Sequence, residues 1–144
     1  MKVGYVDGSA FIRRLALPGE RGSRVDLGQF DRLISSELIQ IETARKLDRL
    51  GLAGVLSGAE VARLRLEAVD VLARFDLVAI DDLVVARAQQ SLGSPLASLD
   101  AIHFATLLLW HERNLADRLV LVTHDEELAE TAQKNGYHVL GTPA

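Results

Sequence analysis

The fold is indicated most clearly by the run Leu119-Val120-Leu121-Val122-Thr123-His124-Asp125. Four consecutive aliphatic residues bounded by polar ones are typical of a strand that is buried on both faces, as in a parallel sheet. The residues after this strand favour a turn, and a helical pattern follows from about Glu126 to Asn135. Gly136 stands at the expected C-terminal cap, before a final short strand at His138 to Leu140.

The same alternation of short β-rich runs with helical runs extends back to the N-terminus. We expect further strands at about Val3–Val6, Leu33–Ser35 and Leu77–Ile80, and helices at about Ala10–Leu15, Ser36–Leu50, Ser57–Arg74, Asp82–Ser91 and Ser98–Trp110. Turn-forming residues from Pro18 to Ser23 predict a loop. The pattern indicates an α/β fold: one domain over residues 1–144, with an open, mostly parallel sheet of about 4–5 short strands and helices on both faces.

The composition limits the classes of function. The 144 residues are 49% apolar and 25% charged, as in an ordinary globular domain with one core. The absence of cysteine excludes disulfides, thiolate catalysis and cysteine-ligated metal centres. The four histidines form no H-E-x-x-H pair. Any metal site must therefore use mainly oxygen ligands, which favours Mg²⁺ or Mn²⁺.

The longest apolar stretch, Ala101 to Trp110, is far shorter than the ~20 residues that span a bilayer. The N-terminus lacks the pattern of a secretory signal. We therefore expect a cytoplasmic protein without a membrane segment.

Basic residues are concentrated early in the chain. The net charge of −4 divides into +2 over residues 1–50 and −6 over residues 51–144. This distribution allows a local basic rim for an anionic ligand, although the same residues suit solvated helix faces equally well.

Acidic residues follow the expected strands. In a parallel sheet the carboxyl ends of the strands meet at one edge, where ligands of α/β folds bind. The residues that come next in the chain at that edge are Asp7, then Ser36 with Glu37, then Asp81 with Asp82, then Asp125. Carboxylates that converge on one crevice repel one another, and such a cluster usually needs a cation.

Four strings of residues are more specific than this edge rule. They are Tyr5-Val6-Asp7-Gly8-Ser9-Ala10, Ser36-Glu37-Leu38-Ile39-Gln40-Ile41-Glu42, Ser98-Leu99-Asp100-Ala101-Ile102-His103-Phe104-Ala105-Thr106 and Val122-Thr123-His124-Asp125. In this order and at this spacing they resemble the PIN domain, especially the VapC-type toxins of bacterial toxin–antitoxin pairs. The resemblance covers nearly the whole chain, and the third string is the most diagnostic.

This resemblance implies an open α/β sheet, a Mg²⁺- or Mn²⁺-dependent endoribonuclease, a small cognate antitoxin as protein partner and a homodimer. The family's catalytic and metal-binding acids would fall on Asp7, Glu42, Asp100 and Asp125, with Ser9 and Thr123 as polar helpers. Gly8 replaces a common threonine, at a position that we expect to contact no ligand atom.

The chemistry of RNA cleavage explains these residue types. Hydrolysis of a phosphodiester needs a deprotonated water and stabilisation of an anionic phosphate, and a divalent cation supplies both. A few carboxylates suffice, because Mg²⁺ keeps several waters and takes a substrate phosphate as a ligand. Nearby basic residues are candidates for contact with the RNA backbone: Arg13, Arg14, Arg45 and Lys46.

For the two proposed ligands that follow strands, an ordinary structural role is also open. Asp7 follows a strand and is suited to cap the next helix, which is compatible with binding a metal. Thr123 and Glu126 fit a capping box that would leave Asp125 as a helical residue.

The other two acids also have alternatives. Glu42 extends an apolar stripe and lies three and four residues before Arg45 and Lys46, so a helix salt bridge is open to it. If Ser98 caps its helix, Asp100 lies in the first turn, where the helix dipole favours an acid. We leave His103 and His124 out of the metal site, because an isolated histidine is more often structural.

Two other functions are compatible with an α/β sheet of this kind. One is a PIN-like module that has lost catalysis and acts through protein partners, but all of the family's acidic positions are occupied here. The other is a phospho-acceptor receiver or phosphatase. A receiver needs an acidic pair at the first strand, whereas Asp7 stands alone.

Overall fold

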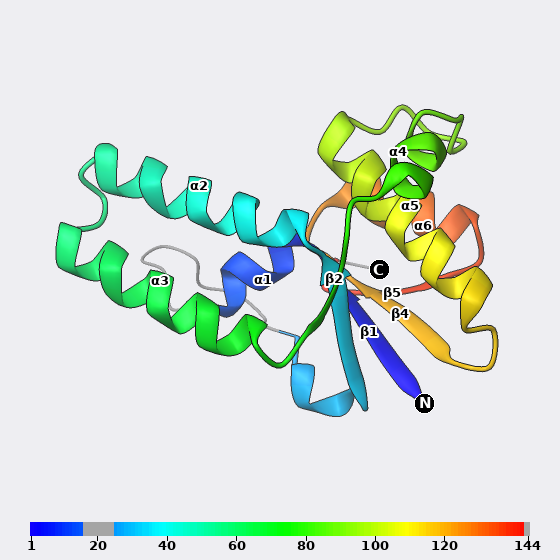
Figure 1. The fold of residues 1–144 in the computed structure, drawn as a ribbon, viewed down its shortest axis with the longest axis horizontal. Helices are drawn as coiled ribbons and strands as arrows, with labels where there is room; N and C mark the ends of the chain where they lie inside the picture. Colours follow the sequence, from blue (N-terminus) through cyan, green and yellow to red (C-terminus); the bar gives the residue numbers. More distant parts are fainter. Residues whose placement is uncertain (16–24, 143–144) are drawn as a thin grey trace.

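The computed structural model describes residues 1–15 and 25–142. The strands are β1 (Lys2–Val6), β2 (Arg32–Ser36), β3 (Asp76–Val78), β4 (Arg118–Val122) and β5 (His138–Leu140). The helices are α1 (Gly8–Arg14), α2 (Leu38–Leu52), α3 (Gly58–Leu72), α4 (Asp82–Ala88), α5 (Ser98–Arg113) and α6 (Glu126–Lys134), with a short 3₁₀ helix at Leu27–Gln29 (Figure 1). The loop expected from Pro18 to Ser23 lies outside the described residues.

The strands form one five-stranded sheet in the order β3-β2-β1-β4-β5. Every neighbouring pair is parallel, with Tyr5 opposite Ile34 of β2 and Leu121 of β4. This confirms the expected open parallel sheet, and it places β1 and β4 at its centre. The carboxyl ends of β1 and β4 are consequently adjacent.

Alternate residues of the central strands enter two separate cores. Val6, Val120 and Val122 lie in a core with α1, α2 and α3. Val3, Tyr5 and Leu121 lie in a core with α5 and α6 on the opposite face. Since successive side chains of a strand point to opposite faces, helices on both sides explain why β4 is aliphatic from Leu119 to Val122 without a polar alternation.

The structure shifts several of the expected boundaries. The third strand begins at Asp76 and ends at Val78, two residues before the predicted end, and α5 continues beyond Trp110 to Arg113. Asp81 caps α4 by accepting a hydrogen bond from the amide of Val84. The expected position of Gly136 at the end of α6 is confirmed, and its φ is 85°.

The start of α5 differs from the sequence prediction. Ala97, and not Ser98, is the N-cap residue, and its side chain makes no capping bond. Ser98 is therefore the first helical residue and Asp100 the third. Asp100 still lies in the first turn, where the dipole favours a negative charge.

Within the described residues we find no helix with the length and apolar character needed to cross a membrane.

Candidate active site

Asp7 lies immediately after β1 and caps α1. Its Oδ1 accepts hydrogen bonds from the amide of Ala10 (3.0 Å) and from the hydroxyl of Ser9 (2.8 Å). Its Oδ2 accepts from the hydroxyl of Thr123 (2.7 Å). The residue is only 3% exposed. The Asp7 carboxylate thus caps α1 and also lies at the edge of the sheet, two roles that the sequence analysis found compatible.

Burial raises the pKa of Asp7, and the hydrogen bonds from Ala10, Thr123 and Ser9 act in the opposite direction. Taking a carboxylate out of water disfavours its charge, whereas donors that point at it favour the charge. The donors consequently matter twice, because they orient the carboxylate and support its ionised form.

Ser9 and Thr123 join Asp7 to the end of β4. The hydroxyl of Ser9 accepts from the amide of His124 (3.0 Å), and that of Thr123 accepts from the amide of Asp125 (3.0 Å). Asp125 caps α6, with Oδ1 accepting from the amide of Leu128 (2.9 Å). The capping box expected with Thr123 as the cap is therefore wrong, because the Thr123 hydroxyl is engaged by Asp7 and Asp125.

Asp100 lies on the first turn of α5 and is half-buried. Burial, and after it the negative charges of Asp125, Asp7 and Glu42, together raise its pKa to about 6. The other three acids predicted from the sequence therefore all act on Asp100, which is the repulsion expected where carboxylates converge. We call Asp7, Glu42, Asp100 and Asp125 the acidic edge.

These side chains do not form a ready-made metal cage. In residues 1–15 and 25–142, no three histidine or acidic side chains are grouped closely enough to hold a metal ion. Carboxylate oxygens that repel one another suit a hard divalent cation. In this structure, however, the four carboxylates contact surrounding residues and not one another.

Glu42 makes a contact that the sequence analysis missed. Its Oε1 lies 2.5 Å from Nε2 of His103, while Arg45 pairs instead with Asp48 at 3.2 Å. Arg45 therefore does not form the helix salt bridge with Glu42 that the sequence left open. Glu37, the other candidate acid on this segment, accepts from the amide of Ile80.

The expectation that Gly8 contacts no proposed ligand atom is wrong, whereas His103, left out of the metal site as a structural residue, lies beside the same carboxylate. His103 contacts Glu42 directly, and a Cβ added at Gly8 would lie 2.8 Å from Oε1 of Glu42. The spacing held a usable signal for the histidine, because Asp100 and His103 are three residues apart and share one helix face. Nothing local to Gly8 indicated that a side chain 34 positions later would pack on it.

The basic residues suggested for RNA lie on α1, which follows Asp7, and on α2, which carries Glu42. Arg13 and Arg14 are in the last turn of α1, and Arg45 and Lys46 are in α2. The Arg14 and Arg45 side chains are exposed, whereas Arg13 and Lys46 are partly buried. Their role stays a prediction.

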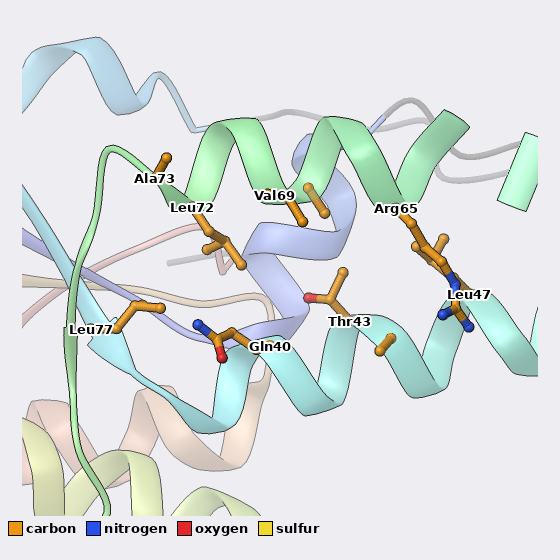
Figure 2. Close-up of a pocket in the computed structure, with 10 residues that line it drawn as sticks. Gln40, Thr43, Leu47, Arg65, Val69, Leu72, Ala73 and Leu77 are labelled. Carbon is orange, nitrogen blue, oxygen red and sulfur yellow. The ribbon is translucent and has the colours of Figure 1, made fainter. Parts of the chain in front are cut away.

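A cavity of about 560 Å³ lies between α2 and α3, away from the acidic edge. Figure 2 shows Thr43 of α2 facing Val69 of α3, with Leu72 toward one end and Leu47 and Arg65 at the other. None of the four acids lines this apolar cavity. In the sequence, only the apolar stripes of the two helices pointed to it.

The fold and the acidic edge together define a class: a fully parallel α/β protein with carboxylates at the carboxyl edge of its central strands. The sequence profile of the PIN domain matches residues 4–134, and the chain belongs to the PIN domain family.

Comparison with solved structures finds proteins of similar fold. The fold is similar to a crystal structure described as a member of the VapBC family of toxin–antitoxin systems, VapBC-5 from Mycobacterium tuberculosis. The TM-score is 0.54 at 18% sequence identity, with 96% of each chain covered. No curated protein gives a significant sequence match.

Proposed function

We propose that the protein is a metal-dependent endoribonuclease and the toxin of a type II toxin–antitoxin pair. The observation that carries this proposal is the acidic edge, where burial and three neighbouring carboxylates raise the pKa of Asp100 to about 6. Membership of the PIN family and the fold shared with a VapBC toxin–antitoxin protein support it.

Asp7, Glu42, Asp100 and Asp125 would hold Mg²⁺ or Mn²⁺. A bound divalent cation lowers the pKa of water and stabilises negative charge on a phosphate. The protein's own part is to supply negative oxygen donors and to hold them. Asp7 is held most firmly, since Ser9, Ala10 and Thr123 all donate to it. Thr123 also accepts from the Asp125 amide, so one hydroxyl links two of the acids.

The basic side chains are proposed to contact the RNA backbone. Arg13 and Arg14 lie on the helix that begins after Asp7, and Arg45 and Lys46 lie on the helix that carries Glu42. Positive charge on these helices would offset the net charge of −4 toward a polyanion. The substrate would be unpaired RNA, whose bases are accessible, and not an A-form duplex.

The proposed partner is a small cognate antitoxin, because the structural neighbour is described as part of a VapBC toxin–antitoxin system. A homodimer acting in the cytoplasm completes the proposal.

The proposal is tested with the purified protein and single-stranded RNA. We expect excess EDTA to abolish cleavage and Mn²⁺ to restore it. We expect Asp7→Asn to lower the cleavage rate by roughly 100-fold or more, because even residues that only support metal ligands contribute 10- to 100-fold. Asparagine still caps a helix, so the fold should persist.

Asp81→Asn is the matched control, since Asp81 is also an N-cap residue whose Oδ1 accepts from the amide three positions on. Its cleavage rate should equal that of the wild type. Cleavage that persists in EDTA would contradict the mechanism. A folded protein that binds a partner but cleaves no RNA with Mn²⁺ would favour the inactive binding module.

A further inference from the structure

His103 is a buried histidine with both ring nitrogens engaged. It is 1% exposed. Its Nδ1 lies 2.8 Å from the hydroxyl of Tyr5, and its Nε2 lies 2.5 Å from Oε1 of Glu42. The Tyr5 and His103 rings meet edge to face at 5.8 Å. These three residues come from β1, α5 and α2, so the contact joins three elements that are distant in sequence.

The chemistry of the end groups sets the direction of these hydrogen bonds. A carboxylate can only accept, so Nε2 of His103 carries the hydrogen and donates to Glu42. The other nitrogen of a neutral imidazole is then an acceptor, and it receives the hydroxyl proton of Tyr5. Burial raises the pKa of Tyr5, which keeps that proton in place. The chain of donors runs from Tyr5 to His103 to Glu42.

Gly8 leaves the space that the Glu42 carboxylate occupies. A Cβ at position 8 would lie 2.8 Å from Oε1, 2.9 Å from Cδ and 3.0 Å from Oε2 of Glu42. The carboxylate therefore packs on the backbone of the residue that follows Asp7. Gly8 is the first residue of α1 and does not have a positive φ, so the reason for glycine here is space and not backbone conformation.

We propose that Tyr5 and His103 are positioning residues, which hold the Glu42 carboxylate at the acidic edge, and that Gly8 provides the space it occupies. The meaning of this placement for metal binding rests on the proposed function. The hydrogen-bonded chain itself does not, and it can be measured without any metal. His103 supports Glu42 as an outer-shell partner supports a ligand, and it does not touch the reacting atoms.

The first experiment is NMR spectroscopy of the metal-free protein labelled with ¹⁵N-histidine. We expect His103 to have a protonated Nε2 and an unprotonated Nδ1. Gly8→Ala should shift the Nε2 resonance by pushing Glu42 away, and Tyr5→Phe should shift that of Nδ1. Gly58→Ala is the matched control, because Gly58 is also the first residue of a helix and a Cβ there meets nothing within 4 Å. A ring protonated on Nδ1, or a spectrum of Gly8→Ala identical to that of Gly58→Ala, would overturn the proposal.

The second experiment is calorimetric titration with Mn²⁺ alone, with circular dichroism to confirm folding. We expect Gly8→Ala and His103→Leu to weaken binding by roughly 10- to 100-fold, the usual effect of losing a supporting partner. His103→Gln should bind nearly as the wild type does, since its amide nitrogen is as many bonds from the backbone as Nε2 and also donates.

The outcomes separate the two proposals. If the folded His103→Leu protein binds Mn²⁺ as tightly as the wild type, the positioning role is wrong. If the wild type binds no Mn²⁺, the proposed function fails, and the NMR result alone decides whether Tyr5 and His103 hold Glu42.

Discussion

At the scale of single residues, Asp7 and Asp100 have the same side chain in contrasting surroundings. Asp7 is almost fully buried and accepts hydrogen bonds from three groups. Asp100 is half-buried and lies in the field of the other acids. A carboxylate in the second situation costs the folded state free energy, because its charged form is desolvated and repelled. The position is thus not explained by stability.

We expect Asp100→Asn to stabilise the metal-free protein at neutral pH. The pKa of about 6 lies above the ordinary value of 3.8, so the folded state binds a proton more tightly than the unfolded state does. The cost of ionisation therefore grows as pH rises from about 4 to about 6 and is complete above that range. Asparagine removes this cost, and we expect a gain of about 1 kcal/mol at pH 7.5 after allowance for solvent screening.

The measurement is urea unfolding in EDTA at pH 4 and at pH 7.5. The gain should shrink to a small part of its value at pH 4, where the folded wild type is protonated and ionisation of the unfolded state is still incomplete. Asp82→Asn is the control, since Asp82 is an exposed acid in the first turn of α4. A gain that is equal at both pH values would contradict the electrostatic explanation.

At the scale of elements, the helix starts depend on side chains in different ways. The hydroxyl of Ser57 accepts from the amide of Glu60, whose carboxylate accepts from the amide of Ser57. This capping box satisfies two amides that the first turn of α3 would otherwise leave unpaired. Ser98 is also a serine near the start of a helix, but it is the first residue inside α5, after the Ala97 cap, whereas Ser57 is itself the cap of α3.

We expect Ser57→Ala to lower the free energy of unfolding by about 1 kcal/mol, the usual effect of losing a serine cap. Ser98→Ala should change it by less than about 0.5 kcal/mol, as for an exposed residue without a capping role. Thermal and urea unfolding of the two variants measure this difference. Equal losses would mean that Ser98, as the sequence first suggested, does cap α5.

At the scale of the whole molecule, the fold brings together acids that are distant in the chain. The parallel pairing of β1 with β4 places the caps of α1 and α6 side by side, and Thr123 bonds to both Asp7 and Asp125. α5 and α2 add Asp100 and Glu42 from elsewhere in the sequence. A cation that binds these groups only in the folded state would stabilise the whole fold.

We expect Mn²⁺ at 100 times its dissociation constant to raise the free energy of unfolding by about 2.7 kcal/mol. The Asp7→Asn protein, measured at the same Mn²⁺ concentration, should show little of this gain. Thermal unfolding with and without Mn²⁺ gives the comparison, and Asp81→Asn should respond as the wild type does. An equal gain in Asp7→Asn would place the ion elsewhere.

The local pattern of the sequence determined the strands, the helices and the open parallel sheet. Aliphatic runs such as Leu119 to Val122 and the helical spacing of apolar residues in α3 depend on neighbours in the chain, so they were predicted within a few residues. The four motifs in order also identified the acids that the fold then brought near one another.

Only the tertiary structure decided how those acids are held. Whether Ser98 or Ala97 caps α5, and whether the Thr123 hydroxyl serves its own helix or Asp7, depends on groups that arrive from other elements. The contacts of Glu42 with His103 and with the space at Gly8 join residues 61 and 34 positions apart. Such contacts are set by packing across the two cores, because hydrogen bonds and steric fit act between neighbours in space, whichever positions they occupy in the sequence.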